Sequence, residues 1–271
     1  MMGRNRVTSM SSADLYNEIV QMTRELVRRS AHPRRKTLML SPELAAFVTA
    51  AVPAAPDGPM VAAPSREDNA EALAALARDV AACTKCELCK TRTQTVFSDG
   101  NPHADLVFVG EAPGADEDRI GRPFVGRAGQ LLTDIIVKGM KMRRQDVYIC
   151  NVLKCRPPEN RDPLPEEKRL CEPYLIRQLE LVHPKVICAL GAHAATTLLR
   201  TDLSTGRLRG HWHSYYGIPL RVTYHPSYLL RKPEEKKKAW EDIQHVMRFL
   251  TGEEKAERSS ASLSVPDDSL A

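Results

Sequence analysis

The chain has 271 residues, of which 42% are hydrophobic and 27% are charged, a composition that supports a sizeable folded core. This length predicts one domain with extensions rather than two full domains. No apolar run approaches the ~20 residues that cross a bilayer, and the first residues lack the apolar stretch of a secretory signal. We therefore expect neither a membrane protein nor an exported one, but a cytoplasmic protein.

The charge and the cysteine count leave two kinds of partner open. The formal net charge is +5, from 39 Lys and Arg against 34 Asp and Glu. This mild excess permits nucleic-acid binding without demanding it, because only positive charge gathered on one face would indicate it. Seven cysteines are an odd number in a chain without an export signal. They favour a metal or cluster site over disulfides.

The two ends of the sequence differ from its middle. Residues 12–30 carry apolar side chains at helical spacing and predict an amphipathic helix. Residues 42–64 hold eight Ala and five Pro without a sustained period, which is typical of a flexible linker. The last twenty residues predict a disordered tail. We therefore divide the chain into an N-terminal extension at 1–67, a folded domain at 68–251 and a tail at 252–271.

Between these ends, apolar segments of strand length alternate with helical segments. Such alternation predicts an α/β domain with a largely parallel sheet. In sheets of this kind, ligands bind at the carboxyl edge, where the strands end in loops. The expected strands are 105–109, 147–152, 186–190 and 220–223, and the expected helices are 67–83, 128–140, 166–182, 192–199 and 233–250.

Five of the cysteines form a spaced set. Cys83, Cys86 and Cys89 make the pattern C-x2-C-x2-C, and Cys155 and Cys171 follow on either side of a Pro-rich segment. Four thiolates can bind zinc or an iron–sulfur cluster, and the spacing alone does not choose between them. The other two cysteines lie inside apolar strands, where a thiol serves as a small buried side chain.

Unusual residues stand at the ends of three expected strands. The first strand runs into a glycine-rich segment, 110–129, that contains four acidic residues and Phe124. Its glycines let backbone N–H groups approach a ligand, although it matches neither a dinucleotide fingerprint nor a phosphate-binding loop. Asn151 ends the second strand as a turn former or as a reader of a polar ligand. His225 follows the last strand, in a loop over the sheet edge. These positions predict a single site.

Three motifs in these segments resemble the family 4 uracil-DNA glycosylases, the thermostable iron–sulfur type. They are G-E-A-P-G-x-x-E-D-x-x-G-x-P-F-V-G-x-A-G, C-N-V-L-K-C-R-P-P-x-N-R-x-P and H-P-S-Y-L-L-R, and they occur in family order. The likeness covers roughly residues 70–250, about two thirds of the chain. It implies a three-layer αβα sandwich with a central four-stranded, largely parallel sheet. It also implies a DNA-repair enzyme that hydrolyses the N-glycosidic bond of uracil, releasing the free base and leaving an abasic site.

The resemblance further implies a cofactor and a partner. The cofactor would be a [4Fe–4S] cluster held by Cys83, Cys86, Cys155 and Cys171. Cys89 stands where relatives commonly carry another residue type, so it is left out of the ligand set. The partner would be uracil-containing DNA, single- or double-stranded, bound by a monomer with nucleoid-associated activity and no role at a membrane.

Three residues would read the uracil and assist its departure. By the resemblance, Phe124 stacks on the flipped base, Asn151 bonds its Watson–Crick edge and His225 faces its O2. Taking the base out of the stack costs a few kcal/mol, which an aromatic platform offsets in part. An amide both donates and accepts, matching O4 and N3–H of uracil and opposing the pattern of cytosine. A donor at O2 stabilises the negative charge that develops as the bond breaks.

The remaining candidates concern water and phosphate. Ala112, counted with the substrate-binding residues, stands where the better-known uracil glycosylases place a water-positioning Asp. Glu117 is therefore the candidate for orienting water or supporting the sugar cation, with Glu111 behind it. Phosphate contacts supply salt-dependent affinity with little sequence information. The candidates for these contacts are Arg156, Arg161, Arg207, Arg209 and Arg231.

Two other functions are kept as alternatives. A related subfamily binds uracil-DNA covalently through a basic insertion with a reactive His, and residues 155–171 contain no such insertion. A non-enzymatic, cluster-bearing module that binds DNA or a polymerase is the second alternative. Free uracil, a stable adduct or no product would distinguish the three.

Overall fold

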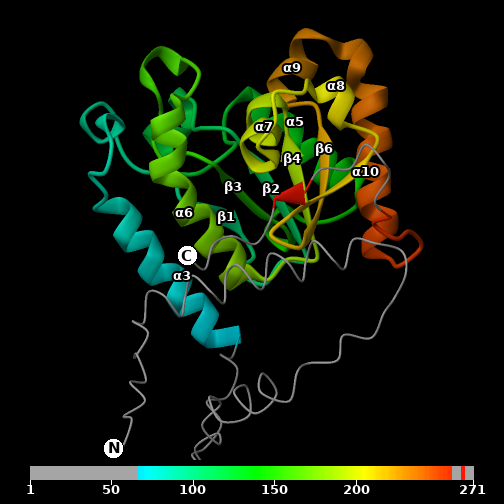
Figure 1. Cartoon of the computed structure of the whole chain (residues 1–271), viewed down its shortest axis with the longest axis horizontal. Helices are drawn as coiled ribbons and strands as arrows, with labels where there is room; N and C mark the ends of the chain where they lie inside the picture. Colours follow the sequence, from blue (N-terminus) through cyan, green and yellow to red (C-terminus); the bar gives the residue numbers. More distant parts are fainter. Residues whose placement is uncertain (1–65, 258–263, 266–271) are drawn as a thin grey trace, which may run out of the picture. The chain divides into compact units, whose positions relative to one another are not determined.

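The computed structural model describes residues 66–257 and 264–265 (Figure 1). The helix expected at 12–30, the linker at 42–64 and most of the tail therefore lie outside the described residues. None of the described helices is long and apolar enough to cross a membrane.

Four parallel strands form the centre of the sheet, in the order β3-β2-β4-β6. Their apolar residues are buried on both faces, as expected for a parallel sheet covered by helices on each side. The predicted four-stranded parallel core is confirmed. Its strands are β2 (Leu106–Gly110), β3 (Tyr148–Asn151), β4 (Val186–Leu190) and β6 (Ile218–Thr223).

Short strands extend this core, so the sheet has seven strands within the described part of the chain. β1 (Asp99–Gly100) pairs antiparallel with β3, and β7 (Ser264–Val265) pairs with β5. β5 (Trp212–Tyr215) and β6 form an antiparallel hairpin. Its two turn residues, Tyr216 and Gly217, both have positive φ, the backbone of a type I′ turn. The sequence prediction missed β5 because a Tyr-Gly turn is a weaker hairpin signal than Asn-Gly.

Alternate side chains of the strands enter two separate cores. Val107, Val109 and Ile187 pack with α3, α6 and α7, whereas Phe108 and Cys188 pack with α5 and α10. In Figure 1, α6 and α10 lie on opposite sides of the strands. The predicted three-layer αβα sandwich is confirmed. The helices are α3 (Arg66–Ala81), α5 (Arg127–Asp134), α6 (Pro165–Val182), α7 (Ala192–Leu199) and α10 (Lys236–Leu250).

Two of the expected helices are divided, and three short α-helices in the described part of the chain were not expected. The helix predicted at 128–140 continues after α5 as a π-helical turn, Ile135–Gly139. The helix predicted at 233–250 opens with a 3-10 turn, Pro233–Glu235. The additional α-helices are each six residues long or shorter; they are α4 (Ala115–Ile120), α8 (Thr205–Leu208) and α9 (Pro226–Arg231).

Candidate active site

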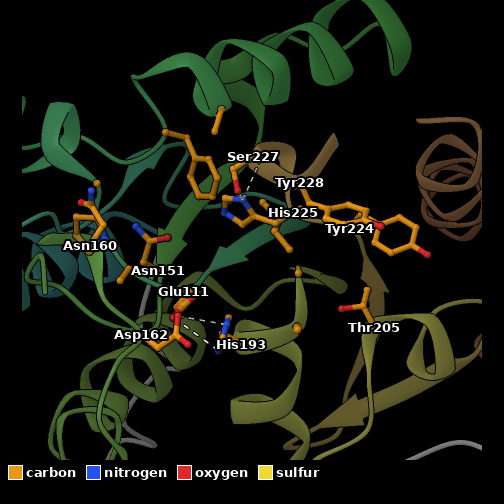
Figure 2. Close-up of a pocket in the computed structure, with 18 of the residues that line it drawn as sticks. Glu111, Asn151, Asn160, Asp162, His193, Thr205, Tyr224, His225, Ser227 and Tyr228 are labelled. Carbon is orange, nitrogen blue, oxygen red and sulfur yellow. Dashed lines mark hydrogen bonds and ion pairs between the residues drawn. The ribbon is translucent and has the colours of Figure 1, made fainter. Parts of the chain in front are cut away.

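A cleft of about 730 Å³ opens at the carboxyl edge of the parallel strands (Figure 2). The loops that follow β2, β3, β4 and β6 line it, because parallel strands all end at the same edge. The structure thus gathers most of the predicted site residues in one place. Those that line the cleft are Glu111, Ala112, Glu117, Phe124, Asn151, Arg161, His225 and Arg231.

Asn151 offers the cleft a buried acceptor. The residue is 2% exposed, and its Oδ1 accepts no hydrogen bond from any described residue. Leaving such an atom without a partner costs about 1–3 kcal/mol, which a bound ligand with a donor would recover. A Cβ at Gly110 would collide with this oxygen and with the Phe124 ring, so glycine is required there. The Lys154 ammonium, itself buried, fixes the strand end by donating to the Asn151 carbonyl at 2.6 Å.

Phe124 is held in a strained conformation beside this amide. Its φ of +53° lies in the left-handed region, which a bulky side chain rarely adopts. Glu117 fastens the following loop, since its Oε1 accepts from the N–H groups of Val125 and Gly126 at 2.9 and 3.0 Å. Its Oε2 accepts from the N–H of Gly114 at 3.2 Å. Glu117 is therefore a positioning residue for Phe124, and its predicted role with water stays a prediction.

His225 presents a defined tautomer. Its Nδ1 accepts the backbone N–H of Ser227 at 3.1 Å and lies 2.7 Å from the Ser227 hydroxyl. Since an amide N–H only donates, Nδ1 carries no proton and the neutral ring carries its hydrogen on Nε2. Burial, reinforced by the charge of Arg231, lowers the pKa of His225 to about 4. The ring centroids of His225 and Phe124 are 5.6 Å apart. His225 is thus a neutral donor beside the Phe124 ring.

A third acidic group joins the cleft through a histidine that the sequence prediction missed. Nδ1 of His193 lies 3.8 Å from Glu111, and its Nε2 lies 3.5 Å from Asp162 (Figure 2). Burial raises the pKa of Glu111, and the nearby His193 acts against this shift. His193 belongs to no motif recognised above, but it follows β4 at the edge where the other site residues lie. Its position directly after an expected strand could have identified His193 as a site residue.

Four of the five predicted phosphate-binding arginines lie in or beside the cleft. Arg161 and Arg231 line it. Arg156 donates from Nε to the side chain of Asn160, a cleft residue, at 2.8 Å. Arg207 is exposed on α8, whose first residues line the cleft.

Arg209 belongs to the interior instead. Its Nε donates to the buried carboxylate of Asp242 at 2.9 Å, and its Nη2 donates to the carbonyl of Lys238. Its side chain is 15% exposed. The guanidinium therefore ties the loop after α8 to α10, and we withdraw Arg209 from the phosphate-binding set.

A second, small cavity collects the spaced cysteines. Cys83, Cys86 and Cys89 reach it from the segment after α3, Cys155 from the loop after β3, and Cys171 from α6. The structure therefore places Cys89 beside the four expected ligands. All described cysteines are free thiols, and the two in β3 and β4 are fully buried, as expected.

Two N–H donors bond to these sulfurs, one from a guanidinium and one from the backbone. Arg92 donates from Nη1 to the Cys155 sulfur at 3.2 Å, and the backbone N–H of Lys154 donates to the Cys171 sulfur at 3.3 Å. Burial raises the pKa of Cys171 to about 11, so this thiol is protonated at neutral pH when it binds nothing. A bound metal would convert it to the thiolate.

The spacing of the sulfurs can be compared with the spacing in a metal site. Among the described residues, three ligand atoms come within 4.8 Å of one another only at Glu111, Asp162 and His193. No three cysteine sulfurs are therefore that close. Four Zn–S bonds of ~2.3 Å require sulfurs about 3.8 Å apart. The sulfurs are thus not drawn together as a bound zinc would hold them, and the thiols at this cavity are a donor set that can hold a metal or an iron–sulfur group.

Comparison with known proteins decides the family. The model of the uracil DNA glycosylase superfamily matches residues 97–244. The type-4 uracil-DNA glycosylase of Thermotoga maritima is 46% identical over 178 residues, which cover 63% of this chain and 91% of that protein. The type-4 enzyme of Archaeoglobus fulgidus is 45% identical over 184 residues, 65% of this chain and 92% of that protein.

The chain belongs to the type-4 uracil-DNA glycosylases. A further type-4 relative, from Saccharolobus solfataricus, is 42% identical over 184 residues, 65% of this chain and 85% of that protein. The resemblance drawn from the three motifs is confirmed. The superfamily match contains every residue that lines the cleft of this type-4 glycosylase, from Glu111 to Arg231.

Proposed function

We propose that this chain hydrolyses the bond between uracil and deoxyribose in DNA, as the first step of base excision repair. One observation carries the proposal. A neutral histidine with its hydrogen on Nε2 lines the same cleft as a buried amide oxygen that has no partner among the described residues. The histidine can donate a hydrogen bond to the departing base, and the amide can recognise that base by hydrogen bonding.

Recognition precedes chemistry. The flipped uracil stacks on Phe124 and presents its N3–H to Oδ1 of Asn151, while the amide nitrogen donates to O4. Cytosine has an acceptor at N3 and a donor at its exocyclic amine, so it opposes both bonds. Because Gly110 leaves room for the Asn151 amide and Lys154 fixes the backbone carbonyl of Asn151, cytosine is rejected without rearrangement of the strand end.

His225 acts as the bond breaks. The electron pair of the glycosidic bond passes to uracil, and much of the resulting charge develops on O2. The Nε2–H of His225 donates to that oxygen, and the neutral ring keeps its proton while it stabilises the anion. Water then forms the bond to C1′. We assign two carboxylates of the cleft to this half of the reaction. Glu111 orients the water, and Glu117 acts indirectly by positioning the loop of Phe124.

The cysteine site fits an iron–sulfur cofactor. We assign a [4Fe–4S] cluster to Cys83, Cys86, Cys155 and Cys171; their shared cavity and the N–H groups of Arg92 and of the Lys154 backbone that donate to two of the sulfurs support it. When bound, this group supplies structural cross-linking between the segment after α3 and the loop that leads from Asn151 to α6. Purified protein should be brown and contain iron.

The DNA contacts follow from the charges around the cleft. We assign Arg156, Arg161, Arg207 and Arg231 to phosphates of single- or double-stranded DNA bound by a monomer. The affinity should then fall steeply with salt and depend little on the flanking sequence. We place this activity in the cytoplasm, on the DNA of the nucleoid.

The test is incubation of the purified, iron-containing protein with a single-stranded oligonucleotide that carries one uracil. Free uracil and an alkali-sensitive abasic site support the proposal. A protein–DNA adduct that survives denaturation would favour the covalent binder instead. DNA that is bound but unchanged would favour the non-enzymatic module.

A further inference from the structure

His193 connects two acidic loops at the wall of the cleft. It stands in the first turn of α7, between Glu111 from the loop after β2 and Asp162 from the loop before α6 (Figure 2). Each ring nitrogen faces one carboxylate, at 3.8 and 3.5 Å. The side chains differ in exposure, 23% for Glu111, 43% for His193 and 78% for Asp162. The inner carboxylate is therefore the one that the histidine can influence most.

The charges around Glu111 oppose one another. Burial raises its pKa, and the charge of Asp162 acts in the same direction. His193 is the strongest of the groups that favour the ionised carboxylate, ahead of Lys168 from α6. The groups that face His193 are Glu111, Asp162 and, across the cleft, His225. An imidazolium in this position offsets part of the cost of burying the Glu111 charge.

The other two candidate positions of the first motif, Ala112 and Glu117, are less available to water. Ala112 has no carboxylate, and the Glu117 oxygens already accept three backbone N–H groups. Glu111 lines the cleft without such a set of backbone bonds.

We propose that His193 is a positioning residue that keeps the Glu111 carboxylate ionised and aimed into the cleft, where Glu111 orients the hydrolytic water. This inference rests on the proposed uracil hydrolysis. The bonding pair leaves with uracil as the glycosidic bond breaks, and the water oxygen then forms its bond to C1′. One water proton passes to Glu111 and then to solvent.

The experiment is the single-turnover rate of uracil release from single-stranded DNA, measured from pH 5 to pH 9. The variants are His193→Gln, Glu111→Gln and the double variant. His183→Gln is the matched control, because His183 is exposed at the end of α6, at the opposite edge of the sheet. His193→Gln should move the acidic limb of the profile to higher pH by about one unit, a tenfold loss on that limb. Near pH 9 its rate should approach that of the wild type, because Glu111 is then ionised without help.

The double variant gives the second readout. If His193 acts through Glu111, the double variant should be no slower than Glu111→Gln alone. If the rate losses of the two single variants multiply in the double variant, the inference is overturned. A pH profile of His193→Gln that is unchanged, or that is lowered equally at every pH, would also overturn it. A wild-type protein that releases no uracil at any pH would instead overturn the proposed function.

Discussion

The cleft and the cysteine site lie on either side of one short segment, Asn151–Cys155, yet they are organised differently. In the cleft, the chain itself holds each group, through the Ser227 amide, the space left at Gly110 and the backbone bonds of Glu117. The cysteine sulfurs stand apart from one another, and burial opposes their ionisation. The chain itself holds the groups of the cleft, whereas we expect the cysteine site to depend on the proposed cluster for its stability.

This contrast predicts that substitutions at the two sites fail in different ways. Changes in the cleft should slow excision in a protein of normal stability. Changes at the cysteines should destabilise the protein and lower activity only as a consequence. Lys154 joins the two sites, since its N–H contacts the Cys171 sulfur and its ammonium bonds the Asn151 carbonyl.

The largest effect is expected at Cys171. Cys171→Ser should lose the brown colour and bound iron, and its free energy of unfolding should fall by more than about 4 kcal/mol. Iron content and denaturant unfolding measure both. Cys89→Ser is the matched control and should keep both, although Cys89 lines the same cavity. A cysteine site that holds stoichiometric zinc and no iron would contradict the assignment.

Asn151 should show the next largest effect, on rate rather than stability. Asn151→Ala removes both bonds to the uracil edge, so kcat/KM should fall by about 10²-fold or more with bound iron unchanged. Asn151→Asp presents an acceptor to the exocyclic amine of cytosine and should release that base at a detectable rate. Single-turnover assays on uracil and cytosine substrates check this. An Asn151→Ala protein that has lost its iron would contradict the claim that substitutions in the cleft leave the cysteine site intact.

The pH behaviour of His225 sharpens the comparison further. Its pKa of about 4 keeps the ring neutral above that pH, so its titration should leave the excision rate unchanged between pH 5 and 8. An unfolded histidine binds its proton near pH 6.5. As the pH falls, His225 therefore binds its proton in the unfolded chain before it does so in the folded protein. The contribution of His225 to the free energy of unfolding should be lost between about pH 6.5 and about pH 4. Nitrogen-15 NMR of the imidazole should show Nε2–H at pH 7.

The last comparison separates two arginines that the sequence assigned to the same phosphate-binding role, and its smallest expected effect is on the salt dependence of DNA binding. Arg209→Gln should lower the free energy of unfolding by about 3–5 kcal/mol, because it leaves the buried Asp242 carboxylate without its closest partner. Arg231→Gln should leave stability unchanged and reduce the salt dependence of DNA binding by about one unit of slope. Denaturant unfolding and binding at several salt concentrations distinguish them. Equal salt slopes for Arg231→Gln and the wild type would remove Arg231 from the DNA interface.

Sequence patterns predicted the features that repeat or that follow from topology. Continuous apolar strands between amphipathic helices indicate a parallel sheet, and such a sheet must bring Asn151 and His225 to the same edge. The patterns could not predict the pairing of single side chains across the fold. Arg209 carries the same charge as Arg231, and only its contact with Asp242 shows that it is internal. His193 and the three backbone bonds of Glu117 likewise depend on loops that are distant in sequence.

The most direct test of the account is single-turnover excision of uracil by His225→Ala compared with the wild type, at saturating enzyme. Because O2 gains its charge only as the bond breaks, the account predicts a 10²–10³-fold slower chemical step. DNA affinity and bound iron should be unchanged. A His225→Ala protein that releases uracil at the wild-type rate would contradict the account and show that this edge of the sheet is not where the bond is broken.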